Sequence, residues 1–416
     1  MHDKDLYAAI LGIRNPWIVT SVELDSALEE IRVKIEAAAG TSQRCPKCQV
    51  ERPGYDTRKR SWRHLDTCQF KTILEADVPR VNCAEHGVLQ IDVPWSEPNS
   101  GFTSMMECLI IDWLGETSIT GVARRMRLTW DEIDGVMQRA VVRGMSRRKS
   151  EKIEQIGVDE VAFRKRHEYT TVVNDTRESR VLYVGEGRGK DALDLFYQGL
   201  ASQQRFDIKI VSMDMWPAYV RSTVEHIWDA HSKIAFDRFH VAKHLGEAVD
   251  QVRRKEHSEL QKEEIDTLKG TKFLWLQNQE NMEGKRRIQF AQLRDLHLKV
   301  ARAWAIKETA RQLWGYVRRG WAEKAWKSWI TWALKSRLEP IQRAATMVKN
   351  HLWGILNAIT LRANNATAES LNAKIQWIKK MACGFRNSQR FINAIYFHCG
   401  KLDMYPRVSC GTHTNS

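Results

Sequence analysis

Four residues with metal-binding side chains occur as two pairs with the same spacing. Cys45 and Cys48 lie in the segment CPKC, and Cys83 and His86 lie in CAEH. Two ligands separated by two residues are typical of one knuckle of a structural zinc site, and two knuckles supply the four ligands of a tetrahedral ion. Such a set is closed and leaves no position for a reacting molecule. The spacing therefore predicts one structural Zn²⁺.

Two alternatives to this zinc set stay open. Without a metal, the cysteines would be ordinary buried thiols and His86 a surface residue. His64 and Cys68 lie between the two pairs and compete as ligands, although they belong to a predicted strand region rather than to a knuckle.

Three carboxylates indicate a second metal site of a different kind. Asp159 ends the run IGVD and Asp214 ends IVSMD, so each acid lies at or near the end of an apolar strand. Neighbouring strands would bring them together, and like charges at short range need a cation, for which Mg²⁺ is suited. Glu369 is the candidate third ligand because it is the only acid between residues 362 and 390, among several Lys and Arg. The alternative for each acid is a solvated or salt-bridged surface group.

A basic helical segment indicates nucleic-acid binding. Residues 121–150 carry eight basic side chains against three acidic ones, and SITGVARRMRLTWDEIDGVMQRAV resembles a helix-turn-helix with its turn near Leu128 and Thr129. The alternative is a solvated, charged helix pair. The predicted DNA contacts in this segment are Arg124, Arg125, Arg127, Trp130, Gln138 and Arg139. Further contacts are predicted for the basic residues around Glu369, namely Lys374, Lys379, Lys380 and Arg386.

Composition agrees with a polyanionic partner. The chain has 416 residues, a formal charge of +14 and 43% apolar residues, which indicates a basic globular protein of several domains. The sequence contains no apolar run of membrane-spanning length and no recognisable export signal, so we expect a cytoplasmic protein with reduced cysteines and no membrane partner. GEGRGK at 185–190 lacks the spacing of a phosphate-binding Walker loop, so no nucleotide cofactor is expected.

The elements that must position these side chains follow from periodicity. Alternating apolar residues at 17–35, including Ile31, Val33 and Ile35, predict a hairpin, and helical patterns at 101–148 predict three short helices. Strand and helix patterns from 153 to about 240 predict a mixed α/β sheet. A strand-free stretch with eight Trp predicts an all-helical block in which most Trp are packing core. The expected domains are a zinc-binding β domain (1–95), a helix-turn-helix domain (96–150), an α/β core (151–245 and 361–400), a helical insertion (246–360) and a frayed tail (401–416).

The order of these motifs resembles the ISL3 family of insertion-sequence transposases. The resemblance runs from about residue 10 to 400 and includes CPKC, VPRVNCAEHGV, IGVDEVAF, SMDMWPAYV, FDRFHVAKH and NATAESLNAKI. It implies a multidomain α+β protein whose ribonuclease-H-like catalytic core is interrupted by the all-helical insertion, with Asp159, Asp214 and Glu369 as its DDE triad. It also suggests that Asp237 and His240 lie near the metal site, although a packed core histidine remains the alternative. One departure from the family is His86, where a cysteine is commoner.

The resemblance also implies a function. We expect a transposase that binds the terminal inverted repeats of an insertion sequence and uses two Mg²⁺ ions, or Mn²⁺, for DNA cleavage and strand transfer. Its partners would be double-stranded DNA, both element ends and target, and a second copy of the chain, in the bacterial cytoplasm at the nucleoid. One rival is a non-catalytic DNA-binding regulator, against which the three intact acids argue. Another rival is a ribonuclease-H-like nuclease without strand transfer, which uses the same metal site and stays open.

Overall fold

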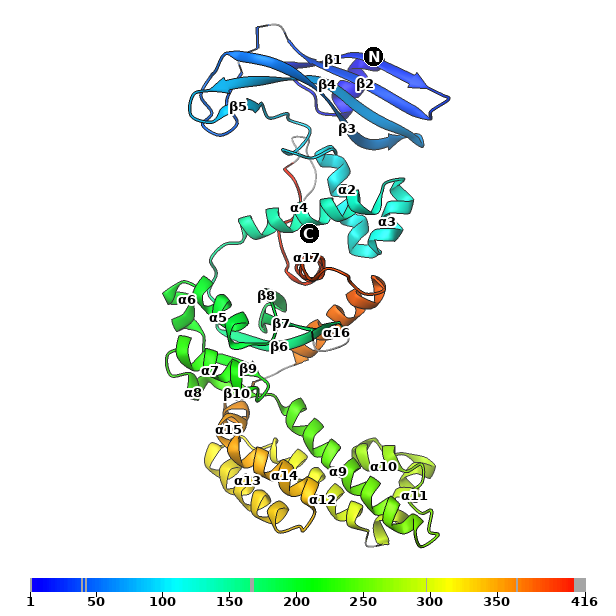
Figure 1. Cartoon of the computed structure of the whole chain (residues 1–416), viewed down its shortest axis with the longest axis vertical. Coiled ribbons are helices and arrows are strands. Elements are labelled where there is room, and N and C mark those ends of the chain that lie inside the picture. The colour runs from blue at the N-terminus through cyan, green and yellow to red at the C-terminus, as the bar shows by residue number, and fades with distance from the viewer. Residues whose placement is uncertain are drawn as a thin grey trace. The chain divides into compact units, whose positions relative to one another are not determined.

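The chain forms two compact units. The computed structural model describes residues 2–38, 40–41, 43–164, 168–296, 298–363 and 366–407. The first unit comprises Met1–Lys149 and the chain from Leu402 onward, and the second comprises Ser150–Lys401 (Figure 1). None of the helices in the described ranges has both the length and the apolar content that a bilayer crossing requires.

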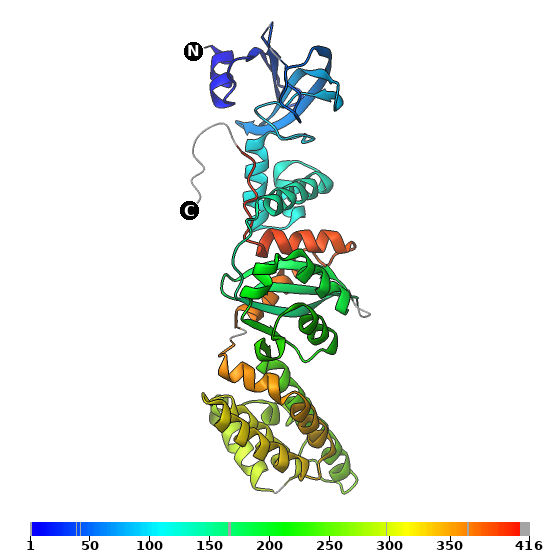
Figure 2. The ribbon, with the colours of Figure 1, turned by 90° about the vertical axis from the view of Figure 1, so that its left-hand side faces the viewer.

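The first unit begins with a β-sheet. Its elements are α1 (Asp3–Ile10), β1 (Trp17–Asp25), β2 (Glu30–Ala37), β3 (Gly54–Thr67), β4 (Phe70–Cys83) and β5 (Gly87–Gln90), and α1 lies beside the sheet (Figure 2). The strand order is β1-β2-β4-β3, with β5 paired to β4. β1 and β2 are antiparallel, which confirms the predicted hairpin. Ile31, Val33 and Ile35 are all buried, as their spacing of two predicts for one face of a strand.

Three helices follow the sheet, as the helical pattern predicts: α2 (Ser104–Glu116), α3 (Ile119–Met126) and α4 (Trp130–Arg147). Each begins at a hydroxyl side chain, Thr103, Ser118 or Thr129, which accepts a hydrogen bond from a backbone N–H of the first turn. Arg127 ends α3 in the left-handed conformation, with φ of 55°. These caps define a short turn between α3 and α4.

Residues 402–405 of the predicted frayed tail (401–416) pack against α2 and α4 instead of fraying, and residues 408–416 lie outside the described residues. The Arg143 guanidinium donates to the Met404 carbonyl, and Tyr405 donates from its hydroxyl to Asp112 at 2.6 Å. A Cβ added at Gly144 would lie 2.6 Å from Cβ of Leu402, so the close approach requires glycine there. This segment has no apolar periodicity, and it is fixed to α4 because guanidinium groups on that helix donate hydrogen bonds to its backbone carbonyls.

The second unit contains a mixed sheet, as predicted. Its strands are β6 (Gln155–Arg164), β7 (Glu168–Asp175), β8 (Arg180–Glu186), β9 (Ile210–Met213) and β10 (Ile234–Phe236), in the order β10-β9-β6-β7-β8. β6, β7 and β8 are antiparallel neighbours, whereas β9 and β10 run parallel to β6. Helices α5 (Lys190–Gly199), α6 (Ser202–Asp207), α7 (Pro217–His226) and α8 (Ala230–Lys233) lie between the strands in sequence.

The two faces of this sheet are covered by different helices. Ile156 and Val158 on β6 join the buried cluster that includes residues of α5 and α7. Phe163, on the opposite face of β6, stacks on Phe391 of α17 (Ser388–Cys399) with ring centroids 5.8 Å apart. Asp159 is four residues before Phe163 on β6, and side chains an even number of residues apart share a face of a strand. The Asp159 side chain therefore points toward the face covered by α16 (Ala366–Met381) and α17.

A long helical stretch separates β10 from α16. It contains α9 (Arg238–Gln261), α10 (Lys272–Leu276), the 3-10 helix Gln279–Asn281, α11 (Gly284–Asp295), α12 (Lys299–Leu313), α13 (Arg319–Leu334), α14 (Glu339–Asn350) and α15 (Leu352–Thr360). No strand is assigned in the described part of this stretch. Trp275, Trp326 and Trp329 are fully buried, as expected for packing core, whereas Trp321 is exposed.

The helical stretch and the sheet share one hydrophobic cluster. α9 follows β10 directly, and Phe236 of β10 meets Trp353 of α15 with ring centroids 4.9 Å apart. Gly354 lies so close that an added Cβ would be 2.4 Å from the Phe236 ring. The same buried cluster continues from the strands into α9, α12, α13 and α14. The helices therefore stabilise the end of the sheet as well as each other.

Candidate functional site

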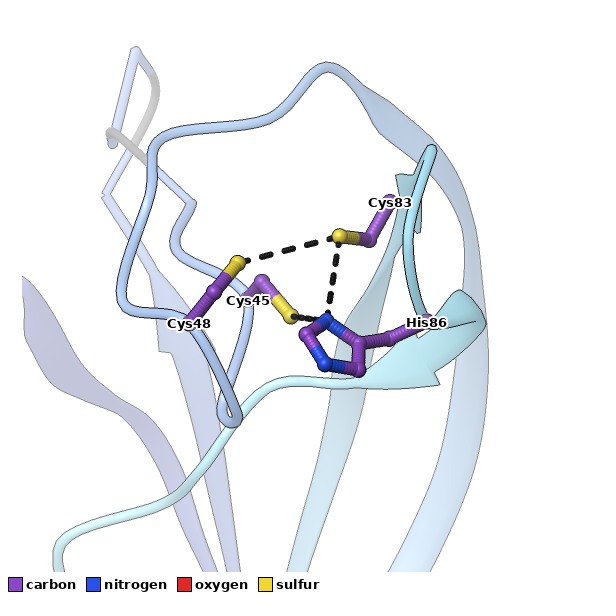
Figure 3. Close-up of side chains that lie close together, drawn as sticks. All are labelled: Cys45, Cys48, Cys83 and His86. Atoms are coloured by element: carbon purple, nitrogen blue, oxygen red, sulfur yellow. Dashed lines mark hydrogen bonds between the residues drawn. The ribbon is translucent and has the colours of Figure 1, made fainter.

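The four predicted zinc ligands lie together in the first unit (Figure 3). Their ligand atoms are all within 4.8 Å of one another, and this is the one such set of three or more metal-binding side chains in the described residues. The Sγ atoms of Cys48 and Cys83 are 3.7 Å apart, and Nδ1 of His86 is 3.5 Å from Sγ of Cys83 and 3.8 Å from Sγ of Cys45. These distances between ligand atoms are close to the edge lengths of a tetrahedron with a metal about 2.3 Å from each sulfur.

Local backbone structure brings each pair of ligands together. Cys45 and Cys48 lie in a tight turn between β2 and β3, closed by a 2.9 Å hydrogen bond from Gln49 N to Cys45 O. Cys83 ends β4, and His86 lies in the turn before β5. Burial alone would raise the pKa of the Cys83 thiol, but hydrogen bonds from His86 and from backbone N–H groups lower it to about 6. An environment that favours thiolate suits a zinc ligand.

The two competing side chains are outside the cluster. His64 is buried on β3, and its Nδ1 lies 2.8 Å from Oγ1 of Thr103, the cap of α2. Burial, with a smaller contribution from Arg63, lowers the pKa of His64 to about 4. Cys68 is exposed in the β3–β4 turn. His64 and Cys68 are thus excluded from the ligand set, which leaves Cys45, Cys48, Cys83 and His86.

Asp159 and Asp214 are neighbours in the second unit because β6 and β9 are paired. Val158 on β6 is in register with Met213 on β9, so the two acids occupy the next position on adjacent parallel strands. The prediction that both acids lie at strand ends needs a correction for Asp159. β6 continues to Arg164, because its far half pairs with β7, whereas Asp214 follows directly after β9. Asp159 is therefore opposite the point where β9 ends.

Polar groups from two helices contact these acids. Asn372 of α16 donates a hydrogen bond from its amide to Oδ2 of Asp159. His240, in the first turn of α9, has Nδ1 3.3 Å from Oδ2 of Asp214 and Nε2 3.8 Å from Oδ2 of Asp237. Asp237 itself caps α9 by accepting from the Phe239 backbone N–H. His240 is therefore in contact with the acids rather than packed in the core.

The electrostatics around Asp159 favour a bound cation. Burial raises the pKa of Asp159, and the charge of Asp237 adds to the effect, while the Glu160 backbone, Asn372 and His240 lower it. Burial also raises the pKa of Glu160, with further contributions from Asp159 and Asp214. Four carboxylates thus share a small region, and the arrangement is suited to hard divalent cations.

Glu369 is in the first turn of α16, with an exposed side chain. It lies three residues before Asn372, so both residues are on neighbouring positions of one helix face. Because Asn372 reaches Asp159, α16 brings Glu369 to the side of the sheet that carries the acids. Asp159, Asp214 and Glu369 do not form a set as tight as the zinc ligands among the described residues.

The helix-turn-helix contains both open and occupied candidate DNA contacts. Arg124 is exposed on α3, Arg125 stacks on Trp113 at 4.3 Å from the ring centroid, and Trp130 is partly exposed at the start of α4. Gln138 is exposed, although its amide donates to Asp134 at 2.7 Å. These positions leave a surface on α3 and α4 for a ligand.

Arg127 and Arg139 hold the first unit together, which sequence reasoning did not anticipate. Arg127 donates to Asp66 at 2.5 Å and to the Gln69 carbonyl at 2.7 Å, in the β3–β4 turn. Arg139 pairs at 2.6 Å with Glu107, whose side chain is 1% exposed and also binds Arg143. A buried carboxylate needs such partners. The two arginines therefore have structural partners within the first unit, and their contact with DNA stays a prediction.

The basic residues near Glu369 also include some whose side chains have hydrogen-bond partners within the chain. The Lys374 ammonium donates to the His398 carbonyl at 2.6 Å, and that of Lys379 donates to the Ala162 carbonyl at 2.7 Å. Lys380 and Arg386 have exposed side chains. Sequence reasoning missed Asn372, although its position three residues after Glu369 on a helix is a signal that was available.

Three family models match the chain. One described as Transposase (DDE_Tnp_ISL3) matches residues 156–395, one described as zinc-finger of transposase IS204/IS1001/IS1096/IS1165 matches residues 41–86, and one described as Helix-turn-helix domain of transposase family ISL3 matches residues 91–141. The first range contains Asp159, Asp214 and Glu369, the second contains the clustered cysteines and His86, and the third contains α2, α3 and the first part of α4.

Curated relatives cover nearly the whole chain. The transposase for insertion sequence element IS1557 of Mycobacterium tuberculosis is 27% identical over 423 residues, covering 94% of both chains. The transposase for insertion sequence element IS1001 of Bordetella parapertussis is 27% identical over 353 residues, covering 83% of this chain and 86% of the relative.

Proposed function

The chain belongs to the ISL3 family of insertion-sequence transposases, and from this premise we propose that Asp159, Asp214 and Glu369 are the DDE triad of its catalytic site. The observation that carries the proposal is the pairing of β6 with β9, which sets the first two acids side by side. The strand order, with three antiparallel strands followed by two parallel ones, supports a ribonuclease-H-like core interrupted by the helical stretch α9–α15.

The donor set fits divalent metal ions. All three acids offer oxygen ligands, which Mg²⁺ and Mn²⁺ prefer, and neither Asp159 nor Asp214 is paired with Lys or Arg in the described residues. Two such ions would stabilise the attacking and leaving oxygens of a phosphodiester displacement.

The chain's own residues have supporting roles around the acids. Asn372 fixes the orientation of the Asp159 carboxylate and ties α16, which carries Glu369, to β6. His240 holds Asp214 from the other side and links it to Asp237 at the start of α9. Residues that orient ligands in this way keep a site ready for its metals.

The reaction we propose has two steps on DNA. Hydrolysis of a phosphodiester at the element end frees a 3′-hydroxyl. That hydroxyl then attacks a phosphodiester of the target DNA, which forms a new phosphodiester bond and releases the 3′-hydroxyl of the target strand. The exposed side chains of Arg124, Arg125 and Gln138, with the partly exposed Trp130, would contact the element end. Lys380 and Arg386 would contact the DNA backbone near the acids. Because two ends must be joined, we propose a homodimer as the active form.

The test uses the purified protein and a duplex with the terminal inverted repeat that encloses its gene. With Mg²⁺, we expect a nicked product with a 3′-hydroxyl and, when target DNA is added, a joined product. With Ca²⁺, which tolerates looser geometry, we expect binding without products. Cleavage without any joined product would instead favour the ribonuclease-H-like nuclease. Binding without cleavage in either Mg²⁺ or Mn²⁺ would favour the regulator.

A further inference from the structure

Arg188, in the loop between β8 and α5, contacts two aromatic rings. Its guanidinium carbon lies 4.4 Å from the ring centroid of Tyr169 on β7 and 4.8 Å from that of Trp216. The Trp216 indole N–H also donates to the Arg188 carbonyl at 3.0 Å. The stacking and this hydrogen bond fix both the side chain and the backbone of Arg188, so its guanidinium is ordered before any ligand binds.

The ordered guanidinium lies beside the acids proposed for catalysis. Trp216 is two residues after Asp214, and Nη1 of Arg188 is 3.7 Å from Oε1 of Glu160, the residue after Asp159. Arg188 is therefore beside the strand position that carries Asp159 and close to the segment that follows Asp214.

The ion pair with Glu160 leaves most of the guanidinium donors available. It is a single long contact, and the two side chains are 38% and 33% exposed, so solvent weakens it. Arginine that stacks on aromatic rings can still bind a ligand through the N–H donors at the edge of its guanidinium, and the ion pair with Glu160 involves only Nη1. An arginine edge of this kind matches the oxygens of a phosphate, with which it forms short, charge-assisted hydrogen bonds.

A group of carboxylates would repel a DNA strand unless cations lie beside it. We propose that Arg188 binds a phosphate of the DNA strand next to the bond that is cut, with Tyr169 and Trp216 as the residues that hold it in place. The ligand is the phosphodiester backbone, so this contact serves any strand that enters the site and carries no sequence preference. The inference rests on the proposed catalytic role of Asp159 and Asp214.

The test neutralises phosphates of the substrate one at a time. Duplexes with the terminal repeat carry a single uncharged methylphosphonate at successive positions around the cleaved bond, and single-turnover cleavage is measured for the wild type and for Arg188→Gln. We expect one neutral position to slow the wild type about 10- to 100-fold, the effect of losing one charge-assisted hydrogen bond. At that position the methylphosphonate should slow Arg188→Gln by less than about 2-fold, because the interaction is already absent.

Two further variants separate phosphate binding from a structural role. Arg188→Lys keeps the positive charge and should keep part of the response to the neutral phosphate. If Arg188→Gln has a lower thermal unfolding temperature than the wild type, Arg188→Lys replaces it in the test. Arg205→Gln on α6 removes the same charge from the same unit and should respond to every methylphosphonate as the wild type does.

The outcomes distinguish this inference from the proposed function. If the wild type cleaves and the methylphosphonate effects are the same in the wild type and the Arg188 variants at all positions, Arg188 does not bind phosphate and the proposed function stands. If Asp159→Asn cleaves as fast as the wild type, the proposed function is wrong and the inference about Arg188 falls with it.

Discussion

The zinc cluster and the acidic site assemble their ligands in opposite ways. The zinc ligands come from two short segments, each of which folds into a turn that sets the spacing within its pair. Asp159 lies on β6, Asp214 directly follows β9, and Glu369 lies on α16. They are separated in sequence by 55 and 155 residues, and only the pairing of β6 with β9 and the packing of α16 bring them near each other.

The chemistry of the two sites differs accordingly. Three sulfurs and one nitrogen within 4.8 Å form a closed, soft ligand set, which is suited to a structural zinc ion. The acids offer hard oxygen ligands in a looser arrangement, which is what a site that also admits a phosphate and water requires. A site that must only hold the fold can be closed locally, whereas a site that must admit a substrate stays open and depends on the tertiary structure. Substitutions in the two sites should therefore differ in what they damage.

Removal of a zinc ligand should have the largest effect, because metal binding and folding are coupled in small zinc modules, with apparent free energies of about 10–16 kcal/mol. Cys45→Ser should reduce zinc from one ion per chain to nearly none and should expose the amides of β3–β5 to hydrogen exchange. The amides of the second unit should keep their protection. Cys68→Ser, which changes an exposed cysteine outside the cluster, is the matched control and should keep its zinc. A full zinc content in Cys45→Ser would remove this residue from the ligand set.

Replacement of an acid should have the opposite pattern, with folding retained and chemistry lost. Asp159→Asn, Asp214→Asn and Glu369→Gln should each slow Mg²⁺-dependent cleavage by at least about 10³-fold, because the metals provide several kcal/mol of transition-state stabilisation. Affinity for the element end should change less than about 2-fold. Glu323→Gln, which alters a partly exposed acid on α13, should cleave normally. Any acid variant that cleaves at a near-normal rate does not belong to the triad.

The stability of the first unit should depend on pH through His64, a buried histidine outside the zinc cluster. Its pKa is about 4 in the folded protein and 6.5 ordinarily, so the fold favours the neutral form. Its contribution to stability is therefore complete above about pH 6.5 and is lost as the pH falls toward 4, by an amount on the order of 3 kcal/mol.

Denaturant unfolding of the wild type and of His64→Asn between pH 7.5 and 5 checks this contribution. The wild type should lose more stability than the variant as the pH falls, since zinc release affects both equally. His2→Asn, an exposed histidine of the same unit, should follow the wild type. Parallel curves for the wild type and His64→Asn would contradict a buried, neutral His64.

Loss of Asn372 should have the smallest effect, because this residue orients a ligand without being one. Asn372→Ala should reduce cleavage about 10- to 100-fold, as is typical when a residue that supports a metal ligand is removed. The apparent affinity for Mg²⁺ should fall as well, which a change in packing alone would not cause. Gln376→Ala, at an exposed position of the same helix, is the control. Normal Mg²⁺ dependence in Asn372→Ala would mean that α16 is positioned by other contacts.

Local patterns predicted much of the fold. The alternation of Ile31, Val33 and Ile35 gave the correct hairpin, because a strand buried on one face needs apolar residues at every second position. The helices α2–α4 and the mixed sheet were also expected from periodicity. The prediction that the chain frays from residue 401 was wrong for residues 402–405, and the ion pair of Arg139 was not predicted. The sequence marks Arg139 as basic but does not indicate that its partner is a buried Glu107 on another helix.

The sequence by itself determined the ligand types and spacing of the zinc cluster, the two strands that carry Asp159 and Asp214, and the helical pattern around Glu369. These features depend on residues close together in the chain, and short-range backbone geometry constrains them directly. Only the tertiary structure decided that Asn372 contacts Asp159, that His240 contacts Asp214, and that Tyr169 and Trp216 contact Arg188. Such contacts join segments that are distant in sequence, and their free energy depends on burial and packing that no local pattern records.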